Sequence, residues 1–289
     1  MDRRRRKPGS DKPGSGRDEP TLPRRLDLAM VEQGLVDSRE LARALIMAGD
    51  VSVDGKPARR AAEPVGQASV LSIRAAPPFV SRGGYKLTHA LDRFSFSPRG
   101  KIAVDVGAST GGFTDVLLQR GAARVYAVDV GYGQLDFNLR SDPRVVVLDR
   151  TNIRSLLALP EQCHLATIDV SFISLRVVIP PVLPLLVEDW DIIALVKPQF
   201  EAGRGQVPRG GVVRDPALHR EILVGLGQWS MQQGMIWNGL TASPIRGAAG
   251  NIEFLAWLKP AAGSTFDLLG LVSEALSETS IELPGRASE

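Results

Sequence analysis

The sequence predicts an α/β fold in which a small α+β domain precedes a large, doubly wound and mostly parallel sheet. From Lys101 onward, apolar strand-like runs alternate with helical patterns, which is the order typical of a parallel sheet covered by helices on both faces. Ahead of that region, residues 22–73 hold two short helical patterns followed by short strand-like runs.

The composition is that of a globular protein. Its 289 residues are 44% hydrophobic and 23% charged, which suits one large and one small domain. The single cysteine, Cys163, excludes an internal disulfide and a cysteine-ligated metal site, and it fits a reducing cytosol. No apolar run reaches the roughly 20 residues of a membrane-spanning helix, and the basic N-terminus lacks the apolar segment of a secretory signal. We therefore expect a cytoplasmic protein with no membrane partner.

The positive charge gathers at the N-terminal end. Residues 1–25 contain nine Lys/Arg and four Asp/Glu, whereas the net charge of the whole chain is only +3. Residues 1–20 also have almost nothing apolar to bury, so we expect a disordered basic leader there. Such a leader can meet phosphates or can be a plain solvated tail, and the sequence leaves both interpretations open.

The small domain begins with two predicted helices. Apolar residues at helical spacing predict one helix between Arg25 and Gly34. Ser38 is a typical N-cap for a second helix, which ends at Gly49. Short strands with a turn between them are predicted over residues 51–73.

This arrangement resembles the S-four-type RNA-binding module. The residues that carry the resemblance are Arg25-Leu-Asp, Gly34-Leu, Ser38-Arg39, Ala42, Leu45-Ile46, Gly49 and Val51-x-Val-Asp-Gly55. The resemblance implies an RNA-binding domain over residues 21–76 that contacts RNA through its helix pair, at Arg24, Arg25, Arg39 and Arg43. Without the resemblance, a solvated helix face would be the simpler interpretation of these arginines.

A linker and a basic helix lead into the large domain. Consecutive prolines interrupt both helix and sheet, so residues 77–84 are predicted to form an interdomain linker. The helix that follows, 85–94, has one apolar face and carries Lys86 near its start. Arg82 and Lys86 thus place a basic segment at the entrance of the domain.

The large domain is predicted over residues 85–262, and a C-terminal tail with one amphipathic helix and no assigned role over 263–289. The strands are expected at 101–106, 124–130, 144–148, 165–170, 191–196, 236–241 and 252–258. The helices are expected at 113–119, around 135–139, near 156, and at 175–186, 217–233 and 266–276. No helix separates the last two strands, which predicts an antiparallel closing strand at the sheet edge.

The turn after the first of these strands indicates a nucleoside ligand. A strand, a glycine turn and a helix open nucleotide-binding α/β domains, because glycines let the backbone approach a ligand closely. The acidic strand end and loose glycine spacing look more like the first motif of S-adenosylmethionine (AdoMet) methyltransferases than a dinucleotide fingerprint. The predicted cofactor-binding residues are Asp105, Gly107, Ala108, Ser109, Thr110, Gly111, Gly112, Phe113, Asp129, Val130, Asp149 and Asp169. Two alternatives remain: the glycine turn is only a tight connection, and Asp129 only caps a turn at its strand end.

Two further strand ends decide the chemistry. Asp169 ends the fourth strand and Lys197 ends the fifth, and a lysine at the end of a buried strand usually has a charged partner. Asp169 is not followed by the proline pair of amino-group methyltransferases, and Cys163 lies at the wrong strand end for cytosine-C5 methylation. In methyl transfer to a ribose hydroxyl, a lysine with a lowered pKa can accept the proton, or a cationic lysine can stabilise the developing alkoxide. Lys86, Asp169, Lys197 and Glu253 offer two lysines with two orienting carboxylates.

This quartet resembles the Lys-Asp-Lys-Glu tetrad of the FtsJ/RrmJ-like 2′-O-ribose methyltransferases. Together with the preceding module, the chain resembles the TlyA family of rRNA methyltransferases, also called haemolysin-like, in segments 81–87, 105–113, 129–135, 169–175, 196–201 and 250–254. The resemblance implies a Rossmann-like AdoMet-methyltransferase sheet with the quartet as its catalytic residues. It also implies methylation of cytidine riboses in small- and/or large-subunit rRNA, within ribosomal subunits or ribosomes. The long leader and extended tail depart from the family pattern and leave the subunit open.

A glycine-rich basic loop, 203–211, follows the fifth strand. Arg204 and Arg209 are candidates for phosphate contacts by a mobile lid, and a plain surface loop is the alternative. Arg82, at the domain entrance, is also predicted to contact RNA. The three histidines of the chain show no ligand spacing, so no metal is expected.

Three other functions compete with methyl transfer. A non-catalytic RNA-binding ribosome factor with a vestigial AdoMet site would explain the small domain, but it leaves the quartet without a role. A membrane-active haemolysin lacks a supporting apolar segment. A dehydrogenase is the weakest alternative, because it explains neither the lysines nor the RNA-binding module.

Overall fold

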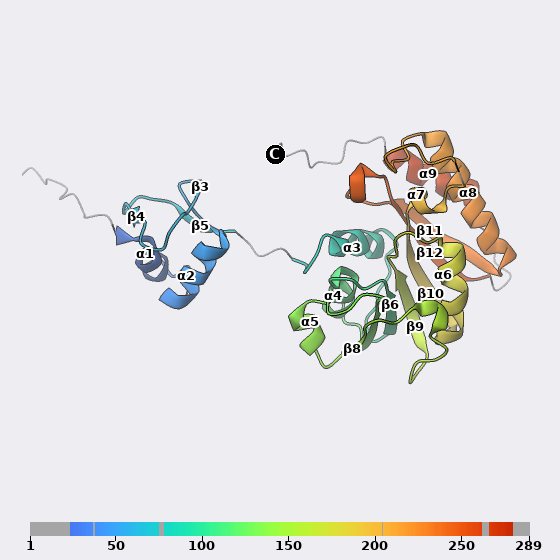
Figure 1. Ribbon diagram of the computed structural model, residues 1–289, viewed down its shortest axis with the longest axis horizontal. Coiled ribbons are helices and arrows are strands. Elements are labelled where there is room, and N and C mark those ends of the chain that lie inside the picture. The colour runs from blue at the N-terminus through green and yellow to red at the C-terminus, as the bar shows by residue number, and fades with distance from the viewer. Residues whose placement is uncertain (1–23, 37, 75–77, 204, 262–265, 280–289) are drawn as a thin grey trace, which may run out of the picture. The chain divides into compact units, whose positions relative to one another are not determined.

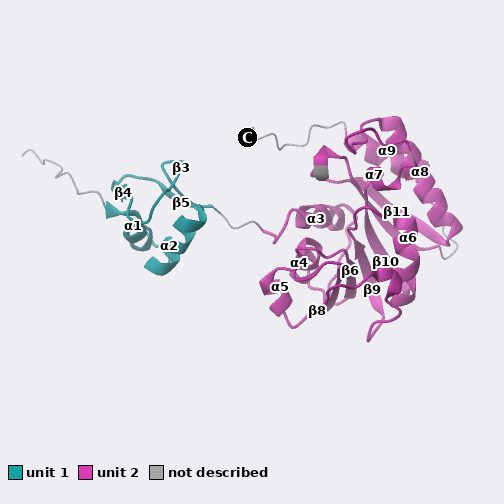
Figure 2. Cartoon of the chain, viewed as in Figure 1, with its two compact units in different colours: residues 1–76 teal, residues 77–289 magenta. Residues whose placement is uncertain are grey.

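The computed structural model describes residues 24–36, 38–74, 78–203, 205–261 and 266–279 of the chain. The chain divides into two compact units, residues 1–76 and 77–289, shown in different colours in Figure 2. The predicted leader, 1–20, and Arg204 of the predicted lid lie outside the described residues.

The first unit joins a helix pair to short strands. Its elements are β1 (Arg24–Arg25), α1 (Leu26–Glu32), α2 (Arg39–Ala48), β2 (Val51–Val53), β3 (Lys56–Pro57), β4 (Pro64–Val65) and β5 (Leu71–Ile73). The strands form a three-stranded antiparallel sheet, β3-β2-β5, and a separate pair, β1-β4. The Ser38 side chain accepts a hydrogen bond from the Leu41 amide at 3.2 Å, so the predicted N-cap of α2 is present. Leu26, Met30 and Ile46 lie in the core between the helices and the sheet.

A seven-stranded sheet forms the centre of the second unit. Its strands are β6 (Ile102–Val106), β7 (Arg124–Val128), β8 (Val145–Leu148), β9 (Cys163–Ile168), β10 (Leu186–Val196), β11 (Met235–Ala242) and β12 (Phe254–Pro260). Their order is β11-β12-β10-β9-β6-β7-β8. Strands β6 to β10 run parallel, and β12 is antiparallel to both β10 and β11. The predicted doubly wound sheet with an antiparallel closing strand is thereby confirmed.

Helices cover both faces of this sheet (Figure 1). One face packs against α3 (Gly83–Arg93), α4 (Gly112–Gln119) and α5 (Phe137–Ser141). The other packs against α6 (Leu175–Val182), α8 (Pro216–Gln232) and α9 (Leu268–Glu278). Short turns complete the unit, namely η1 (Ile153–Ser155), η2 (Leu183–Leu185), α7 (Pro198–Glu201) and η3 (Ala248–Gly250). Because both faces are covered, the parallel strands are apolar almost throughout, as their sequence pattern predicted.

The segment predicted as a linker, 77–84, differs from that expectation from residue 78 onward. The Val80 amide donates a hydrogen bond to Asp115 Oδ2 at 2.9 Å, and Gln119 Nε2 donates to the Pro78 carbonyl at 2.9 Å. Both acceptor and donor side chains belong to α4, so residues 78–82 are fixed on the second unit.

The predicted tail also contains a structural element. Leu268, Val272 and Ala275 of α9 are buried in the core shared with α8 and β11. Glu278 Oε2 accepts hydrogen bonds from Thr241 Oγ1 and from the Ala242 amide, both at 2.8 Å. Helix α9 is therefore part of the fold of the second unit, not an appendage to it.

Candidate functional site

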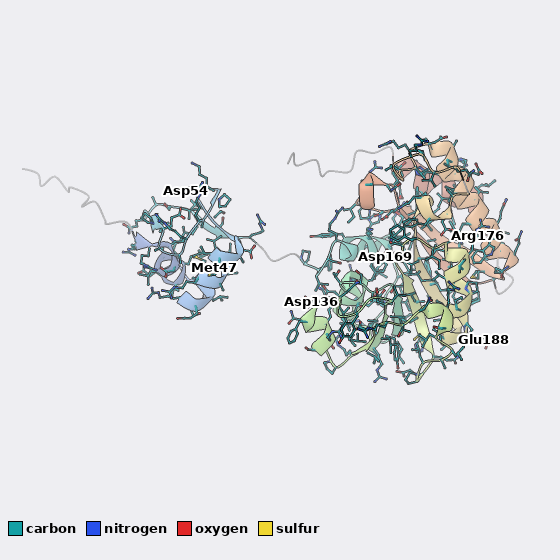
Figure 3. All side chains as sticks on the ribbon, in the orientation of Figure 1. Met47, Asp54, Asp136, Asp169, Arg176 and Glu188 are labelled. Carbon is teal, nitrogen blue, oxygen red and sulfur yellow. The ribbon has the colours of Figure 1, made fainter. Side chains whose placement is uncertain are left out.

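The site lies where the carboxyl ends of four parallel strands meet. Strand β6 neighbours both β7 and β9, and the chain order reverses between these neighbours, which is where doubly wound sheets bind ligands. Gly107 follows β6 with φ +83°, and a Cβ atom there would lie 2.5 Å from the Asp169 carbonyl oxygen. Only glycine fits, so the first turn can approach the end of β9 directly. Asp169 lies near the centre of the second unit (Figure 3).

A cavity of about 530 Å³, here called the large cavity, opens between β6, β7 and β9. Its lining residues are Val106, Gly107, Ser109, Val128, Asp129, Val130, Gln134, Thr151, Asn152, Ile153, Asp169, Val170, Ser171, Phe172, Ile173 and Val178. Asp129 joins two of its walls, since Oδ2 accepts from the Ser109 amide at 2.8 Å and Oδ1 from the Gly131 amide at 2.7 Å. Each of these oxygens keeps a further lone pair for a ligand hydroxyl.

A second cavity of about 300 Å³, here called the small cavity, adjoins the first. Its lining residues are Ser81, Arg82, Gly83, Lys86, Gly107, Ala108, Ser109, Thr110, Gly112, Phe113, Asp169, Ser171, Lys197, Ile245, Arg246 and Gly247. Gly107, Ser109, Asp169 and Ser171 line both cavities. A ligand in the large cavity therefore reaches the small one past Asp169.

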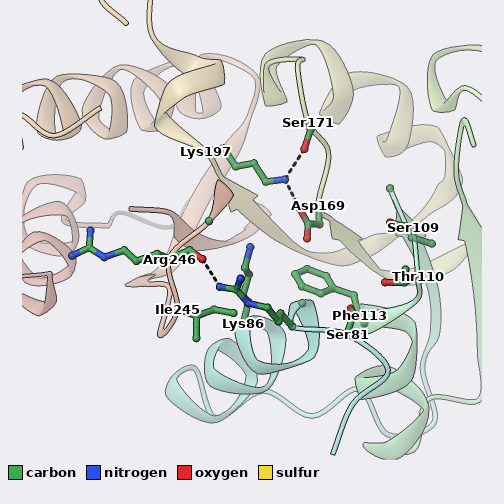
Figure 4. Close-up of a pocket in the computed structure, with 16 residues that line it drawn as sticks. Ser81, Lys86, Ser109, Thr110, Phe113, Asp169, Ser171, Lys197, Ile245 and Arg246 are labelled. Atoms are coloured by element: carbon green, nitrogen blue, oxygen red, sulfur yellow. Dashed lines mark hydrogen bonds and ion pairs between the residues drawn. The ribbon is translucent and has the colours of Figure 1, made fainter. Parts of the chain in front are cut away.

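Two lysine–carboxylate pairs bring the predicted quartet together at the small cavity. Lys197 Nζ lies 2.6 Å from Asp169 Oδ1 and donates a hydrogen bond to Ser171 Oγ at 3.0 Å. Lys86 Nζ lies 2.6 Å from Glu253 Oε2. Figure 4 shows the two lysine side chains pointing into the same space from opposite sides.

Burial makes three of these four side chains unusual, whereas the Asp169 side chain is 23% exposed. Lys86 and Lys197 are each 9% exposed, and Glu253 is 2% exposed. Charged groups are rarely buried to this extent unless they are paired, and inside a low-dielectric site they act strongly on a neighbouring charge. An ammonium carries three N–H donors, of which Lys197 uses two on Asp169 and Ser171. The third remains available to an oxygen in the cavity.

The loop 243–250 closes the small cavity over the Lys86–Glu253 pair. Arg82 Nη2 donates a hydrogen bond to the Arg246 carbonyl at 3.0 Å, which ties this loop to the start of α3. A Cβ atom on Gly247 would lie 2.0 Å from Glu253 Oε1, so the loop backbone rests directly on the carboxylate. Water is thereby kept from the buried side of the pair.

Two aspartates among the predicted cofactor residues line neither cavity. Asp105 is fully buried and accepts hydrogen bonds from Thr114 Oγ1 at 2.6 Å and Thr167 Oγ1 at 2.9 Å. Burial raises the pKa of this carboxyl to about 6. Asp149 accepts from Arg140 Nη2 at 2.8 Å and from the Gly133 amide at 3.2 Å. Asp105 thus links β6 to α4 and β9, and Asp149 links the segment after β8 to the loop after β7 and to α5.

The remaining predicted cofactor residues divide between the two cavities. Asp129 and Val130 line the large cavity, and Asp169 lines both. In the glycine turn, Gly111 lines neither, because it begins α4 with φ +97° and faces Leu135 and Leu139. The other turn residues line the small cavity, namely Gly107, Ala108, Ser109, Thr110, Gly112 and Phe113.

Several lining residues were not found from the sequence. Thr151, Asn152 and Ile153 follow β8 and line the large cavity, whereas the neighbouring Asp149 does not. Ser171 contacts Lys197, and Phe172 beside it is 89% exposed with φ 64°. Their position after a strand end that faces the site was the available signal.

The described arginines that were predicted to contact RNA occupy four environments. Arg25, Arg39 and Arg43 surround one buried carboxylate, Asp27. Arg24 pairs with Glu32 on the surface. Arg82 lines the small cavity, and Arg209 is exposed on the loop after α7 without lining either cavity.

Other groups of the second unit are remote from this chemistry. Cys163 is buried at the start of β9, the strand end opposite the site, and burial raises the pKa of its thiol to about 12. In the part of the chain that the structure describes, no three His, Cys, Asp or Glu side chains are placed to hold a metal ion. None of the described helices has the length and apolar character needed to cross a membrane.

Comparison with known proteins gives two domain matches. A family model for FtsJ-like methyltransferases matches residues 79–260, and a model for the S4 domain matches residues 24–71. The first covers the sheet and both cavities, and the second covers the helix pair and its arginines.

Relatives of known designation match most of the chain. A 16S/23S rRNA (cytidine-2′-O)-methyltransferase TlyA from Mycobacterium tuberculosis is 45% identical over 88% of this chain and 97% of its own length. A protein from Bacillus subtilis, YqxC, designated a candidate rRNA methyltransferase, is 48% identical over 81% of this chain and 85% of its own length. A solved structure from Streptococcus thermophilus, described as a candidate hemolysin, is 40% identical and superposes with a TM-score of 0.66, covering 90% of this chain and 98% of that one.

Proposed function

The chain belongs to the FtsJ-like methyltransferase family, and from that premise we propose that it transfers a methyl group from AdoMet to the ribose 2′-hydroxyl of cytidine in rRNA. The observation that carries the proposal is the pair of buried lysine–carboxylate contacts at the small cavity, next to a large cavity suited to a nucleoside. Neither amino-group nor carbon methylation needs two such lysines.

The large cavity has the features that AdoMet requires. It lies at the strand ends where doubly wound sheets bind nucleosides, and Asp129 offers free lone pairs for ribose hydroxyls. Thr151, Asn152 and Ile153 form the wall where the base would lie. When bound, AdoMet supplies an electrophilic methyl group carried on a sulfonium sulfur. The passage at Asp169 and Ser171 would direct that methyl group toward the small cavity.

The small cavity would receive the acceptor ribose. Lys197 Nζ is held 2.6 Å from the Asp169 carboxylate at the edge of the small cavity, so we assign it to stabilise the developing alkoxide on the 2′-oxygen. Asp169 orients the ammonium and accepts the released proton. Lys86, held by Glu253, adds a second positive charge on the opposite side. Positioning of the acceptor hydroxyl in this cavity supplies much of the remaining rate acceleration over the uncatalysed reaction.

The RNA class rests on the first unit and on the relatives. The S4 domain match covers an exposed arginine cluster, and the M. tuberculosis relative is designated a methyltransferase of 16S and 23S rRNA cytidines. We therefore propose cytidine in small- and/or large-subunit rRNA, within ribosomal subunits or ribosomes, as the substrate. This substrate implies action in the cytoplasm.

Mass mapping of rRNA nucleosides tests the proposal. Purified protein, AdoMet and ribosomal subunits from a strain lacking the enzyme should yield 2′-O-methylcytidine at a defined position. Subunits reconstituted with a 2′-deoxycytidine at that position should gain no methyl group there. Methylation of the base, or unchanged methylation of the deoxy substrate, would refute ribose transfer.

Two alternatives keep a distinct test. A non-catalytic ribosome factor would bind RNA but not AdoMet. If calorimetry detected no binding of AdoMet, even with RNA present, this alternative would be favoured. The hemolysin description of the S. thermophilus structure suggests membrane activity. Lysis of lipid vesicles by nucleic-acid-free protein would support that function.

A further inference from the structure

We infer that Asp27 is a positioning residue, which holds Arg25, Arg39 and Arg43 together as a binding patch for the phosphates of an RNA backbone. The three guanidiniums are here called the arginine patch. The inference rests on the proposed function, because it supplies the RNA-binding step that precedes methyl transfer. It concerns the first unit alone, so its test does not require catalysis.

The geometry converges on one carboxylate. Arg25 donates to Asp27 through Nε and Nη2, both at 3.0 Å, which is a bidentate contact. Arg39 Nη2 donates to Asp27 Oδ2 at 3.3 Å, and Arg43 Nε donates to the same oxygen at 3.1 Å. The residues come from the start of α1 and from α2, so a single side chain links the two helices.

The exposure of the partners is very unequal. The Asp27 side chain is 0% exposed, whereas those of Arg25, Arg39 and Arg43 are 45%, 43% and 47% exposed. The anion is therefore covered by its own cations, while each cation keeps nearly half of its surface in solvent. The Arg25 guanidinium lowers the pKa of Asp27 well below its usual value, so the carboxylate stays charged near neutral pH.

This arrangement solves a problem of charge repulsion. Three guanidiniums at one place repel one another, and long arginine side chains lose entropy when they are ordered. A buried carboxylate offsets the repulsion and fixes the side chains before a ligand arrives, which lowers the cost of binding. The patch still carries a net charge of about +2, since one anion faces three cations.

The unused donors identify the partner chemistry. A guanidinium has five N–H donors, and Arg39 and Arg43 each spend one of them on Asp27. Each guanidinium is planar and its side chain is nearly half exposed, so the remaining donors suit the oxygens of phosphate groups. Arg24 is not part of the patch, because its guanidinium pairs with Glu32. An exposed array of this kind within an S4 domain match favours the backbone of RNA.

Asp27→Asn separates positioning from simple charge. The substitution removes a negative charge beside an RNA-binding surface, so an account based on net charge alone predicts tighter RNA binding. If Asp27 positions the patch, binding weakens instead, by about tenfold at low salt, and the slope of log Kd against log salt falls by about one. The measurement is equilibrium binding of the full chain to an rRNA fragment across a salt series.

Glu40→Gln is the matched control. Glu40 is exposed in the first turn of α2 and also contributes one negative charge to this unit. Its removal should leave RNA affinity equal or slightly higher at low salt. Binding by Asp27→Asn that is as tight as that of Glu40→Gln would overturn the inference.

A coupling measurement guards against loss of folding in Asp27→Asn. Arg43→Gln alone should weaken RNA binding and reduce the salt slope, and in an Asp27→Asn background it should have much less effect. If Asp27→Asn unfolds the first unit, Arg25→Gln, Arg39→Gln and Arg43→Gln still decide the matter in the wild-type background. If all three arginine variants have a lower melting temperature but an unchanged slope of log Kd against log salt, the cluster has only a structural role. That result would overturn the inference.

The RNA-binding results can be separated from the proposed methyl transfer. Asp27→Asn should raise the RNA concentration at half-maximal methylation without changing the rate at saturating RNA. Failure of ribose methylation by the wild-type protein would refute the proposed function while leaving the binding result intact.

Discussion

The two units pair cations with carboxylates in opposite ways. In the first unit, one buried aspartate, Asp27, serves three half-exposed guanidiniums. In the second unit, each buried lysine has a carboxylate of its own, Asp169 for Lys197 and Glu253 for Lys86. The first cluster therefore presents excess positive charge to solvent, and the second is close to neutral and enclosed.

The difference between the two clusters corresponds to two functions, RNA binding and methyl transfer. Exposed cations attract a polyanion over a distance, but salt screens them and each contributes modestly. Enclosed cations with matched anions attract no polyanion, yet in a low-dielectric site they stabilise a charge that appears during reaction. Variants of the first cluster should thus change how tightly RNA binds, and variants of the second should change how fast it is methylated.

Lys197→Ala should give the largest effect. Loss of the group that stabilises the 2′-alkoxide is expected to lower the methylation rate at saturating RNA by about a thousandfold. AdoMet binding, measured by calorimetry, should persist, because Lys197 lines only the small cavity. Lys259→Ala is the control, since Lys259 contacts Asp189 and Asp191 near the other end of β10. A Lys197→Ala rate within tenfold of wild type would contradict the assignment.

Asp105 provides a third kind of buried carboxylate, one with hydroxyl partners and no cation. Its folded pKa of about 6 lies above the ordinary value of 3.8, so the folded state holds the proton more tightly than the unfolded state. The contribution of Asp105 to the free energy of unfolding is fully present below about pH 4. It decreases by about 3 kcal/mol as the pH rises through 6.

Urea unfolding at several pH values checks this prediction. Trp190, Trp229, Trp237 and Trp257 all lie in the second unit, so tryptophan fluorescence reports on it alone. Asp105→Asn removes the titration, and the difference between wild type and variant should fall as pH rises from 4 to 7. A constant difference would show that Asp105 is ionised like an exposed carboxyl.

Glu253→Gln should have the second largest effect on the methylation rate. The change keeps the size of the side chain but leaves Lys86 without its anion, and it should lower the saturating rate by about a hundredfold. Glu188→Gln is the control, because Glu188 is exposed at the periphery of the second unit (Figure 3). If Glu253→Gln changed only the RNA concentration at half-maximal rate, the Lys86–Glu253 pair would belong to binding and the contrast between the units would fail.

Arg43→Gln should have the smallest effect. Removal of one guanidinium from the patch is expected to weaken RNA binding about fivefold at low salt and less at high salt, with an unchanged saturating rate. Arg24→Gln should matter less, because that guanidinium already pairs with Glu32. Equal effects of the two variants would mean that Asp27 confers no advantage on the patch.

The sequence was informative where the chemistry follows a strand end. Apolar runs located the parallel strands, and Asp129, Asp169 and Lys197 follow those runs directly, so they reach the same edge of the sheet. Lys86 and Glu253 lie outside that pattern, and the resemblance to a known tetrad was the main support for predicting them.

Loop conformation explains most of what the sequence did not predict. Ser109, Arg150 and Phe172 follow strand ends at the site, and all three have positive φ although none is glycine. Such residues redirect the chain, so the side chain next to a strand end need not face the cavity. Asp149 accordingly turns to Arg140, and Thr151 lines the large cavity two residues later.

Single-turnover methylation across a range of RNA concentrations tests the central claim most directly. The variants to compare are Lys197→Ala and a triple Arg25→Gln, Arg39→Gln, Arg43→Gln chain. The account predicts that the lysine variant loses maximal rate at an unchanged half-saturating RNA concentration, and that the arginine variant does the reverse. A lysine variant that retains its maximal rate, or an arginine variant that loses it, would contradict the division of work between the two charge clusters.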